Sequence, residues 1–314
     1  MLTWLLIGIG DITTRRVLPA ILAEERSHLA GIVTRDPAKA APYGVPAFTT
    51  LEAALRESEA AAVYVASPVF LHAPQSIAAL AAHRHVLCEK PLAMNLAEAE
   101  RMVAQACESH RTLGVAYYRR SYPKIHRAME LIRGGVIGQP VLAWATCHTE
   151  LPGTKSHRSW LVDPAQAGGG PLYDIACHRI DILNFLFGEP VRVAGQVSNV
   201  IHALAVEDSA TVMIEYKNKL RAIVDVRWHS RIERDEFRII GTDGEMVLTP
   251  LNGPELVYPG GQEGLPIHAN VHYPCVKNFV NAVLDGAPLL SSGSTALWTD
   301  WVTAQVLPGN RETR

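Results

Sequence analysis

The sequence predicts an α/β protein with two domains. We expect a doubly wound parallel sheet at residues 1–120, and an α+β domain with a large, mostly antiparallel open sheet at residues 121–314. The length of 314 residues exceeds what one ordinary core requires. Short apolar segments alternate with helical patterns up to residue 117, whereas long segments of alternating polarity follow residue 191. A last helix at about 294–306 can pack back on the first domain.

The composition excludes several classes of protein. A formal charge of -2 argues against a nucleic-acid footprint or a polybasic membrane patch. The five cysteines include no CxxC pair, which predicts a reducing compartment and no zinc site. The apolar start at residues 2–9 is too short to span a membrane, and no basic region precedes it. We therefore expect a cytoplasmic protein.

The first strand, at residues 2–7, runs directly into a glycine turn and a helical pattern. Strand, glycine turn and helix are the context of a dinucleotide-binding loop in a Rossmann domain. Gly8 permits the tight turn, and Gly10 lets backbone amides approach a pyrophosphate at the helix N-terminus. The third position is Thr13 rather than glycine, and its hydroxyl can cap the helix or reach a phosphate. The candidate cofactor residues of this loop are Gly8, Gly10, Asp11, Ile12 and Thr13.

A second strand at residues 29–33 ends at Thr34 and Arg35. An acidic residue at this place would bind the ribose 2′-hydroxyl of NAD, whereas an arginine favours the 2′-phosphate of NADP. Asp36 before Pro37 is better suited to be the N-cap of the next helix. We therefore predict that Thr34 and Arg35 contact the cofactor and that NADP is preferred over NAD. The alternative is that Arg35 is an ordinary solvated arginine.

A third clear strand, at residues 62–66, ends in Ser67 and Pro68, and a helix from His72 to about residue 83 follows. In a parallel sheet these residues lie at the same edge as the glycine turn, so we include all three as cofactor-binding candidates. His72 alone is also compatible with a surface position in the first turn of that helix. Asn95 then opens a helix as a capping box with Glu98.

The run from His85 to Pro91 places a Glu-Lys pair where a short apolar strand ends. Ligands bind at the carboxyl ends of the strands in open α/β sheets, so Lys90 faces a cleft in this interpretation. Burial there would lower the lysine pKa from about 10.4 toward the range useful for proton transfer. Glu89 and Lys90 are therefore site candidates. The alternative is an exposed ion pair in a turn.

The second half contains a helix with a polar stripe. Asp174, His178 and Asp181 are spaced i, i+4, i+7, which places them on one face of a regular α-helix. A carboxylate beside a histidine can set its tautomer and raise its pKa, which suits acid-base chemistry. The alternative of a metal site is disfavoured because no further ligands cluster nearby, and we predict no metal.

Aromatic and arginine side chains gather between the two halves, at residues 117–123 and 157–160. Tyr117, Arg119 and Trp160 are candidates for binding a polyhydroxylated ligand, with Trp160 as a stacking surface. Domain-interface packing is the alternative. The predicted open sheet, at residues 191–241, has helices near 123–133 and 172–187 on one face. Its other face is a natural subunit interface, so we expect a homo-oligomer, dimer or tetramer. The tail 308–314 is expected to be disordered.

These motifs together resemble the Gfo/Idh/MocA oxidoreductases, named after glucose-fructose oxidoreductase and inositol dehydrogenase. The resemblance rests on the glycine turn, on Glu89-Lys90-Pro91 and on the segment from Gly168 to Asp181, and it covers nearly the whole chain. Thr13 and Ala176 depart from the usual small residues of these motifs, without removing a functional side chain.

The resemblance implies hydride transfer between NADP and a carbinol or carbonyl carbon of a sugar, polyol or related cyclic alcohol. It implies that Lys90 donates or accepts the proton and holds the substrate hydroxyl. His178 is then the second acid-base group or substrate binder, and Asp174 orients His178 and Lys90. Three alternatives share these motifs: an NAD-dependent glycoside hydrolase with transient oxidation, a non-catalytic dinucleotide-sensing regulator, and a dihydrodiol dehydrogenase.

Overall fold

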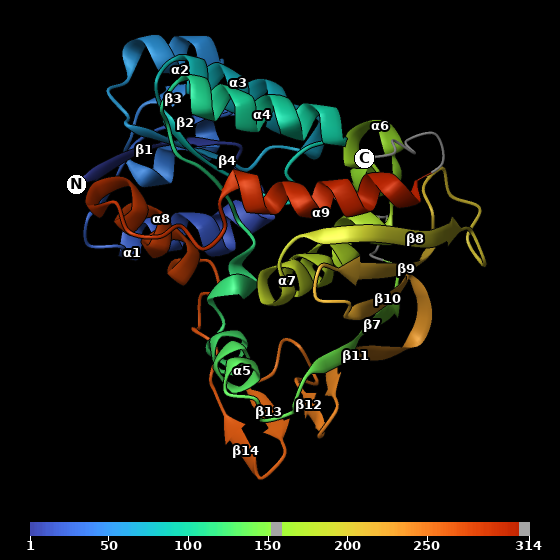
Figure 1. Cartoon of the computed structure of the whole chain (residues 1–314). Coiled ribbons are helices and arrows are strands. Elements are labelled where there is room, and N and C mark those ends of the chain that lie inside the picture. Colours follow the sequence, from blue (N-terminus) through green and yellow to red (C-terminus); the bar gives the residue numbers. More distant parts are fainter. Residues whose placement is uncertain (152–158, 308–314) are drawn as a thin grey trace. The chain divides into compact units, whose positions relative to one another are not determined.

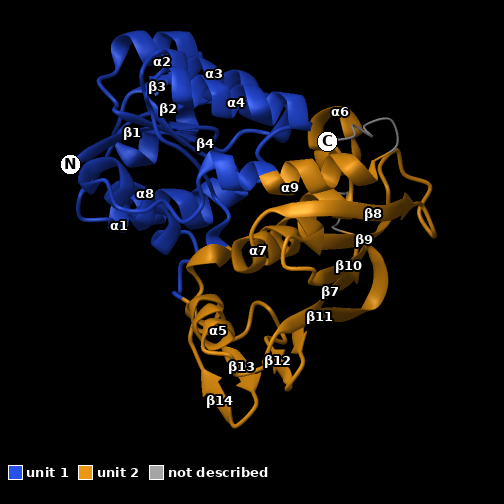
Figure 2. Cartoon of the chain, viewed as in Figure 1, with its two compact units in different colours: residues 1–118, 268–297 blue, residues 119–267, 298–314 orange. Residues whose placement is uncertain are grey.

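The computed structural model describes residues 1–151 and 159–307, and these form two compact units (Figure 2). The first unit contains residues 1–118 and 268–297, and the second contains residues 119–267 and the chain from residue 298 onward. Residues 268–297 therefore join the first unit, whereas the predicted division near residue 120 assigned them to the second domain. The predicted tail at 308–314, together with His157 and Arg158 of the aromatic-arginine segment, lies outside the described residues.

The first unit is built on a six-stranded parallel sheet with the strand order β3-β2-β1-β4-β5-β6. This confirms the predicted doubly wound Rossmann fold. The order reverses between β1 and β4, which is where ligands bind in such sheets. Helices α2, α3 and α4 cover one face, and α1 and α8 cover the other (Figure 1). The strands are Leu2–Ile7 (β1), Ser27–Val33 (β2), Ala47–Phe48 (β3), Ala62–Val65 (β4), His85–Cys88 (β5) and Leu113–Val115 (β6).

Side-chain caps begin several turns and helices of this unit, and those predicted at Asp36 and Asn95 are confirmed. Asp36 accepts a hydrogen bond from the amide of Ala38, and Thr50 accepts one from the amide of Ala53. Asn95 accepts one from the amide of Glu98 at 3.0 Å. The helices are Leu18–Ala23 (α1), Leu51–Glu57 (α2), His72–Ala81 (α3), Leu96–Glu108 (α4) and Tyr273–Asp285 (α8), and Gly293–Val306 (α9) begins in this unit and ends in the second.

The second unit holds an eight-stranded sheet with the order β14-β13-β12-β11-β7-β10-β9-β8. All of its pairs are antiparallel except β7 with β10, which is parallel, so the sheet is mostly antiparallel as predicted. Strands β7, β12, β13 and β14 were not predicted from the sequence. The strands are Pro140–Glu150 (β7), Pro190–Ser198 (β8), Ser209–Tyr216 (β9), Arg221–Arg227 (β10), His229–Gly241 (β11), Glu245–Val247 (β12), Glu255–Tyr258 (β13) and Gly261–Gly264 (β14).

One face of this sheet forms the core of the unit. Alternate residues such as Ala145, Val212 and Val224 point to that face and are fully buried. Helix α7 packs against β10, and α5 packs against β13. Residues on the opposite face, among them Trp144 and Met213, are 40% and 45% exposed. The helices are Pro123–Arg133 (α5), Pro164–Ala167 (α6) and Cys177–Phe187 (α7).

Candidate active site

The glycine turn after β1 contains two glycines with different physical roles. Gly8 has a φ of +87°, and a Cβ there would lie 2.7 Å from the carbonyl oxygen of Ala66, next to the end of β4. The fold therefore needs glycine at this position. Gly10 is exposed, its φ is not in the left-handed region, and a Cβ there would meet nothing within 4 Å. The packing of the described chain does not require Gly10, which leaves its backbone open to a ligand.

The helix that follows this turn begins with a π-helical segment, Thr13–Val17 (η1), before α1. Wide turns of this type frequently mark functional sites. Thr13 is fully buried, and its hydroxyl makes no hydrogen bond with the described residues. Asp11 and Ile12 are half-buried, and Asp11 forms an ion pair of 3.3 Å with Arg15. The Thr13 hydroxyl was expected to cap the helix or to reach a phosphate; it caps no amide of the described residues, and contact with a phosphate remains a prediction.

The end of β2 carries an arginine that has no ion-pair partner among the described residues. Thr34 is buried, and its hydroxyl bonds the backbone of Asp36 at 3.2 to 3.3 Å. Arg35 is exposed and forms no ion pair with any residue of the described chain. Its guanidinium is therefore available to an anion.

The loop after β4 is tied to the loop after β5 through a buried histidine. His72, 1% exposed, lies with Nδ1 2.8 Å from the carbonyl oxygen of Pro91 and Nε2 2.9 Å from that of Ser67. Burial lowers the pKa of His72, and hydrogen bonds to these two carbonyls offset part of that effect. Ser67 donates to Gln75 at 2.7 Å, and Pro68 is half-buried. Both ring nitrogens of His72 thus lie at hydrogen-bonding distance from backbone carbonyls, and the side chain links the loop after β4 to the loop after β5. Direct contact of His72 with a cofactor remains a prediction.

Glu89, at the end of β5, is a buried carboxylate with several donors. The hydroxyl of Tyr64 donates to Oε1 at 2.8 Å, and Nε2 of His272 lies 3.1 Å from the same oxygen. The amide of Lys90 donates to Oε2 at 3.3 Å. Burial alone would raise the pKa of Glu89, but the hydrogen bonds from His272 and Tyr64 and the charge of Lys90 outweigh it and lower the pKa. The carboxylate next to Lys90 is therefore ionised.

In the second unit, the glycine run before α7 closes around Glu207. A Cβ at Gly170 would lie 2.0 Å from the carbonyl oxygen of Glu207, so only glycine fits there. The Glu207 carboxylate accepts the amide of Leu172 at 3.0 Å, at the start of a second π-helical segment, Leu172–Ala176 (η7). Burial raises the pKa of Glu207, and hydrogen bonds from the backbone offset part of this effect. The contact fixes the segment that carries Asp174, which is half-buried, and leads to His178, which is 4% exposed.

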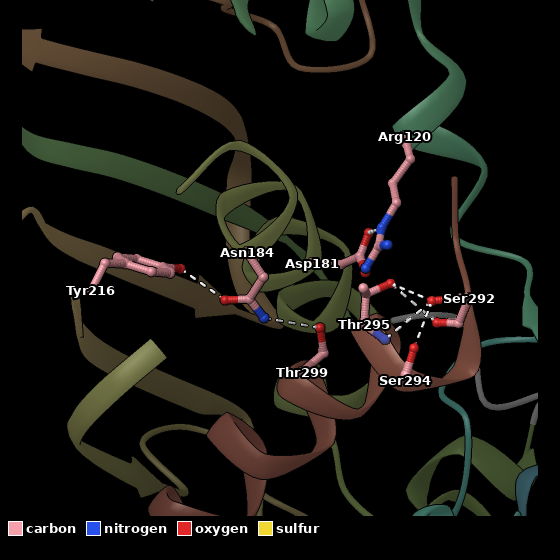
Figure 3. Close-up of polar contacts among 8 residues, drawn as sticks. All are labelled: Arg120, Asp181, Asn184, Tyr216, Ser292, Ser294, Thr295 and Thr299. Atoms are coloured by element: carbon pink, nitrogen blue, oxygen red, sulfur yellow. Dashed lines mark hydrogen bonds and ion pairs between the residues drawn. The ribbon is translucent and has the colours of Figure 1, made fainter. Parts of the chain in front are cut away.

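Helix α7 is anchored by polar contacts on its buried side (Figure 3). Nε of Arg120 donates to both carboxylate oxygens of Asp181, at 2.9 and 3.1 Å, and both side chains are at most 2% exposed. Asn184 accepts the hydroxyl of Tyr216 at 2.9 Å and donates to Thr299 at 3.3 Å. Asp181 thus forms a buried ion pair with Arg120. The expectation that it would flank His178 as a second carboxylate is wrong, because its oxygens are committed to the guanidinium.

The remaining substrate candidates are placed in different surroundings. Tyr117 is buried in the first unit beyond β6. Arg119 belongs to the second unit, where it is 8% exposed and donates to the side chain of Asn252 at 3.0 Å. Trp160 is partly buried against a cluster of apolar residues around Trp228. Trp160 thus packs within its own unit, which is not the domain-interface packing given as the alternative, and its role as a stacking surface for substrate remains a prediction.

Sequence reasoning missed three functional candidates: His272, Glu207 and Asn252. Each lies far along the chain from the group it contacts, and none belongs to a local motif. The only available signal was residue type, since a buried polar side chain requires a partner. In residues 1–151 and 159–307, no three His, Cys, Asp or Glu side chains are grouped so that they could hold a metal ion. Within the same ranges, no helix combines the length and hydropathy needed to cross a membrane.

Both halves of the chain match known protein families. Residues 2–117 match the oxidoreductase family with an NAD-binding Rossmann fold, and residues 125–247 match the GFO/IDH/MocA C-terminal domain. A 1,5-anhydro-D-fructose reductase of Ensifer adhaerens is 30% identical over 310 residues, which cover 94% of this chain and 92% of the relative. The chain belongs to the Gfo/Idh/MocA family of oxidoreductases. The resemblance predicted from the motifs is confirmed.

Other Gfo/Idh/MocA relatives agree with this assignment. An NADP-dependent D-xylose 1-dehydrogenase of Haloarcula marismortui is 29% identical, covering 78% of this chain and 71% of the relative. A crystal structure of an aldose-aldose oxidoreductase from Caulobacter crescentus, complexed with glycerol, superposes with a TM-score of 0.85 at 25% identity. It covers 96% of this chain and 95% of that structure. The protein is thus an NAD(P)-dependent oxidoreductase.

The residues of the first unit fit the dinucleotide that this family binds. Gly10 carries no side chain although neither its backbone nor its neighbours demand glycine, which leaves room for a pyrophosphate beside the helix start. Gly8 brings the end of β1 against Ala66 at the end of β4, the point where the strand order reverses. The turn would hold the pyrophosphate, and Thr34 and Arg35 would lie at the adenosine ribose.

Proposed function

We propose that the protein transfers a hydride between NADP and a carbinol or carbonyl carbon of a sugar, polyol or related cyclic alcohol. The observation that carries this proposal is the edge of the first sheet. There, a lysine follows an ionised, buried glutamate at the end of β5, and the open glycine turn follows β1. A proton-transferring group and a dinucleotide loop at one sheet edge are the two parts that this reaction requires.

Lys90 is the proposed proton donor and acceptor. A bound nicotinamide supplies or accepts the hydride. A C–H bond gives up a hydride readily only when the neighbouring hydroxyl loses its proton, so Nζ of Lys90 takes that proton in oxidation and returns it in reduction. Lys90 is half-buried, and its main-chain amide is bound to the Glu89 carboxylate. This contact holds the backbone of the turn from which the lysine side chain extends.

Asp174 and His178 of the second unit are the proposed partners of Lys90. In this proposal, His178 holds the substrate hydroxyl or acts as a second acid-base group, and Asp174 orients His178 and Lys90. Two facts support the assignment: the Glu207 contact fixes the segment that carries Asp174, and the Arg120–Asp181 pair anchors the helix that carries His178. We also assign Tyr117, Arg119 and Trp160 to the substrate site, on residue type.

NADP is the proposed cofactor, in preference to NAD. The exposed guanidinium of Arg35 at the end of β2 makes no ion pair in the described chain, so it is available for a 2′-phosphate. The acidic residue nearest this strand end, Asp36, accepts the amide of Ala38 and caps the next turn. The relative from Haloarcula is also named for NADP.

A sugar-like substrate is supported by the names of the relatives, which are an anhydrofructose reductase and a xylose dehydrogenase. Guanidinium and imidazole groups such as those of Arg119 and His178 are suited to binding several hydroxyls. We propose two probe reactions to determine which sugar is the substrate and in which direction the reaction runs. They are the reduction of 1,5-anhydro-D-fructose with NADPH and the oxidation of D-xylose with NADP.

The experiment that tests the proposal compares Lys90→Ala with wild type in a screen of sugars, keto-sugars, inositols and dihydrodiols, followed by nicotinamide absorbance. We expect turnover to fall by about 10²–10⁴-fold, the usual contribution of positioned proton transfer. Binding of NADPH, measured by fluorescence titration, should be retained. Lys39→Ala, at an exposed lysine of the same unit, is the matched control. Unchanged turnover in Lys90→Ala would exclude the assigned role.

We further propose that the protein forms a homo-oligomer through the open face of the second sheet. The side chains of Trp144 and Met213 lie on the face opposite the core and are 40% and 45% exposed. Both residues pair with Ile223 in the strand register, so these exposed apolar side chains are neighbours on one face, and such exposed apolar groups are found at subunit interfaces. Light scattering coupled to size exclusion should give a dimer or tetramer, and Met213→Lys should shift the mass toward the monomer. A monomeric wild type would contradict this proposal.

A further inference from the structure

The hydrogen-bonded cluster at the Glu89 carboxylate joins side chains from three separate parts of the first unit. Tyr64 comes from β4, Glu89 from the end of β5, and His272 from the segment just before α8. All three side chains are buried: Tyr64 is 0%, Glu89 7% and His272 1% exposed. His272 and Glu89 are 183 residues apart in the chain. An unpaired carboxylate at this depth would be strongly disfavoured, so these donors decide whether Glu89 is ionised.

The hydrogen-bonding partners define the protonation of this cluster. An ionised carboxylate only accepts hydrogen bonds. Nε2 of His272 therefore carries a hydrogen and donates a hydrogen bond to Glu89. Nδ1 of His272 is buried and has no hydrogen-bond partner among the described residues. The ring also contacts that of Tyr118, with the ring centroids 4.8 Å apart and the planes tilted by 35°. The position of the imidazole is therefore set by the aromatic contact and by the carboxylate it serves.

Glu89 in turn holds the backbone of Lys90. Oε1 receives the two side-chain donors, and Oε2 receives the main-chain amide of Lys90 at 3.3 Å. On the other side of the turn, His72 bonds the carbonyl oxygen of Pro91 at 2.8 Å. The turn that carries Lys90 is thus held from both sides by buried histidines. Displacing a proton-transferring group by about 1 Å can cost on the order of 10²-fold in rate, so this support matters for chemistry.

We propose that His272, assisted by Tyr64, is a positioning residue that fixes Lys90 through the carboxylate of Glu89. The inference rests on the proposed function of Lys90 and adds a residue from a segment distant in sequence to the machinery of proton transfer. His272 acts through Glu89 and does not touch the reacting atoms. Its contribution is to hold the glutamate side chain in the orientation that binds the Lys90 amide.

Two substitutions of His272 separate the donor from the bulk of the ring. His272→Gln places an amide N–H near the position of Nε2 and keeps a donor to Glu89, whereas His272→Leu removes it. Tyr64→Phe keeps the buried ring and removes the other donor, and it serves if His272→Leu does not fold. Thermal unfolding and NADPH titration of each variant show whether the fold and the cofactor loop are intact.

The first readout requires no substrate. Each protein is treated briefly with acetic anhydride, and the labelling rate of Lys90 relative to the exposed Lys39 and Lys217 is measured by mass spectrometry of peptides. We expect several-fold faster labelling of Lys90 in His272→Leu, because a released turn exposes the half-buried amine. His272→Gln should restore the wild-type rate. A folded His272→Leu protein that labels Lys90 at the wild-type rate would overturn the inference.

The second readout is turnover with the probe reactions named above. We expect kcat to fall by about 10- to 100-fold in His272→Leu, with KM for NADPH unchanged and substantial recovery in His272→Gln. Equal losses in the Gln and Leu variants would contradict a role through the donor. The two hypotheses fail separately: turnover retained in Lys90→Ala refutes the proposed function, whereas the labelling result tests the link between His272 and Lys90 by itself.

Discussion

The two glycines of the dinucleotide loop provide a sharp test of how this chain divides its residues between folding and binding. At Gly8, a substitution to alanine forces a left-handed φ of +87° and places a methyl group 2.7 Å from a backbone carbonyl oxygen. The strained conformation alone costs on the order of 1–3 kcal/mol. At Gly10, the added methyl group meets nothing within 4 Å, and the lower entropy of the unfolded chain contributes about 0.4–1 kcal/mol in favour of folding.

For cofactor affinity the order of the two substitutions is reversed: the loss is expected in Gly10→Ala. A methyl group at Gly10 occupies space that a pyrophosphate needs to reach the backbone amides, and losing one charge-assisted hydrogen bond costs roughly 1.5–3 kcal/mol. That corresponds to a Kd for NADPH about 10- to 100-fold weaker. Gly10→Ala should therefore be as stable as wild type and bind poorly, whereas Gly8→Ala should lose stability in the absence of any cofactor.

The measurements are urea unfolding without cofactor and fluorescence titration with NADPH on the same three proteins. The Gly8→Ala protein is the matched control, since it changes the same residue type in the same loop. Wild-type affinity for NADPH in Gly10→Ala would refute the placement of the pyrophosphate. A loss of stability in Gly10→Ala comparable to that of Gly8→Ala would refute the division of roles.

Three further predictions follow from contacts in the structure. Arg120→Met leaves the carboxylate of Asp181 buried without its partner and should lower the free energy of unfolding in urea by about 3–5 kcal/mol, whereas the double variant with Asp181→Leu should recover most of the loss. Arg35→Ser should weaken NADP binding by at least about 10-fold in calorimetry and leave NAD binding unchanged; equal losses would contradict the 2′-phosphate contact. Burial alone would raise the pKa of Asp225, but side-chain hydrogen bonds within the second sheet hold it at about 2. Because the unfolded-state pKa is about 3.9, roughly 2 kcal/mol of stability should be present above that value and disappear as the pH falls through 2, and Asp225→Asn should flatten this dependence in urea unfolding.

The local sequence was sufficient for the first unit. Short apolar segments ending in turn residues predicted the strands at residues 2–7, 29–33 and 62–66 and the strand before Glu89, and Asp36 and Asn95 cap the turn and the helix that they were expected to cap. Each of these features depends on residues within about four positions of one another, so the local sequence is sufficient to predict it. The two-residue strand β3 was missed because it is too short to show an alternation of apolar and polar residues.

The second unit was predicted less completely. Strand β7, at residues 140–150, lies in the middle of the sheet and pairs in parallel with β10, yet it was not recognised from the sequence. Its pairing joins residues about 80 positions apart and depends on no turn between them. Asp181 shows the same limit at the level of one side chain: its spacing from His178 suggested acid-base chemistry, but Arg120 binds it.

The sequence by itself determined the family, the doubly wound sheet, and the residues whose chemistry is written in a short motif, such as Gly8, Glu89 and Lys90. Only the tertiary structure showed that His272 donates a hydrogen bond to Glu89. It also showed that Glu207 accepts a hydrogen bond from the amide of Leu172, at the start of the segment that carries Asp174. The physical reason is burial: a carboxylate removed from water must find its donors wherever the fold brings them, and those donors carry no local signature in the chain.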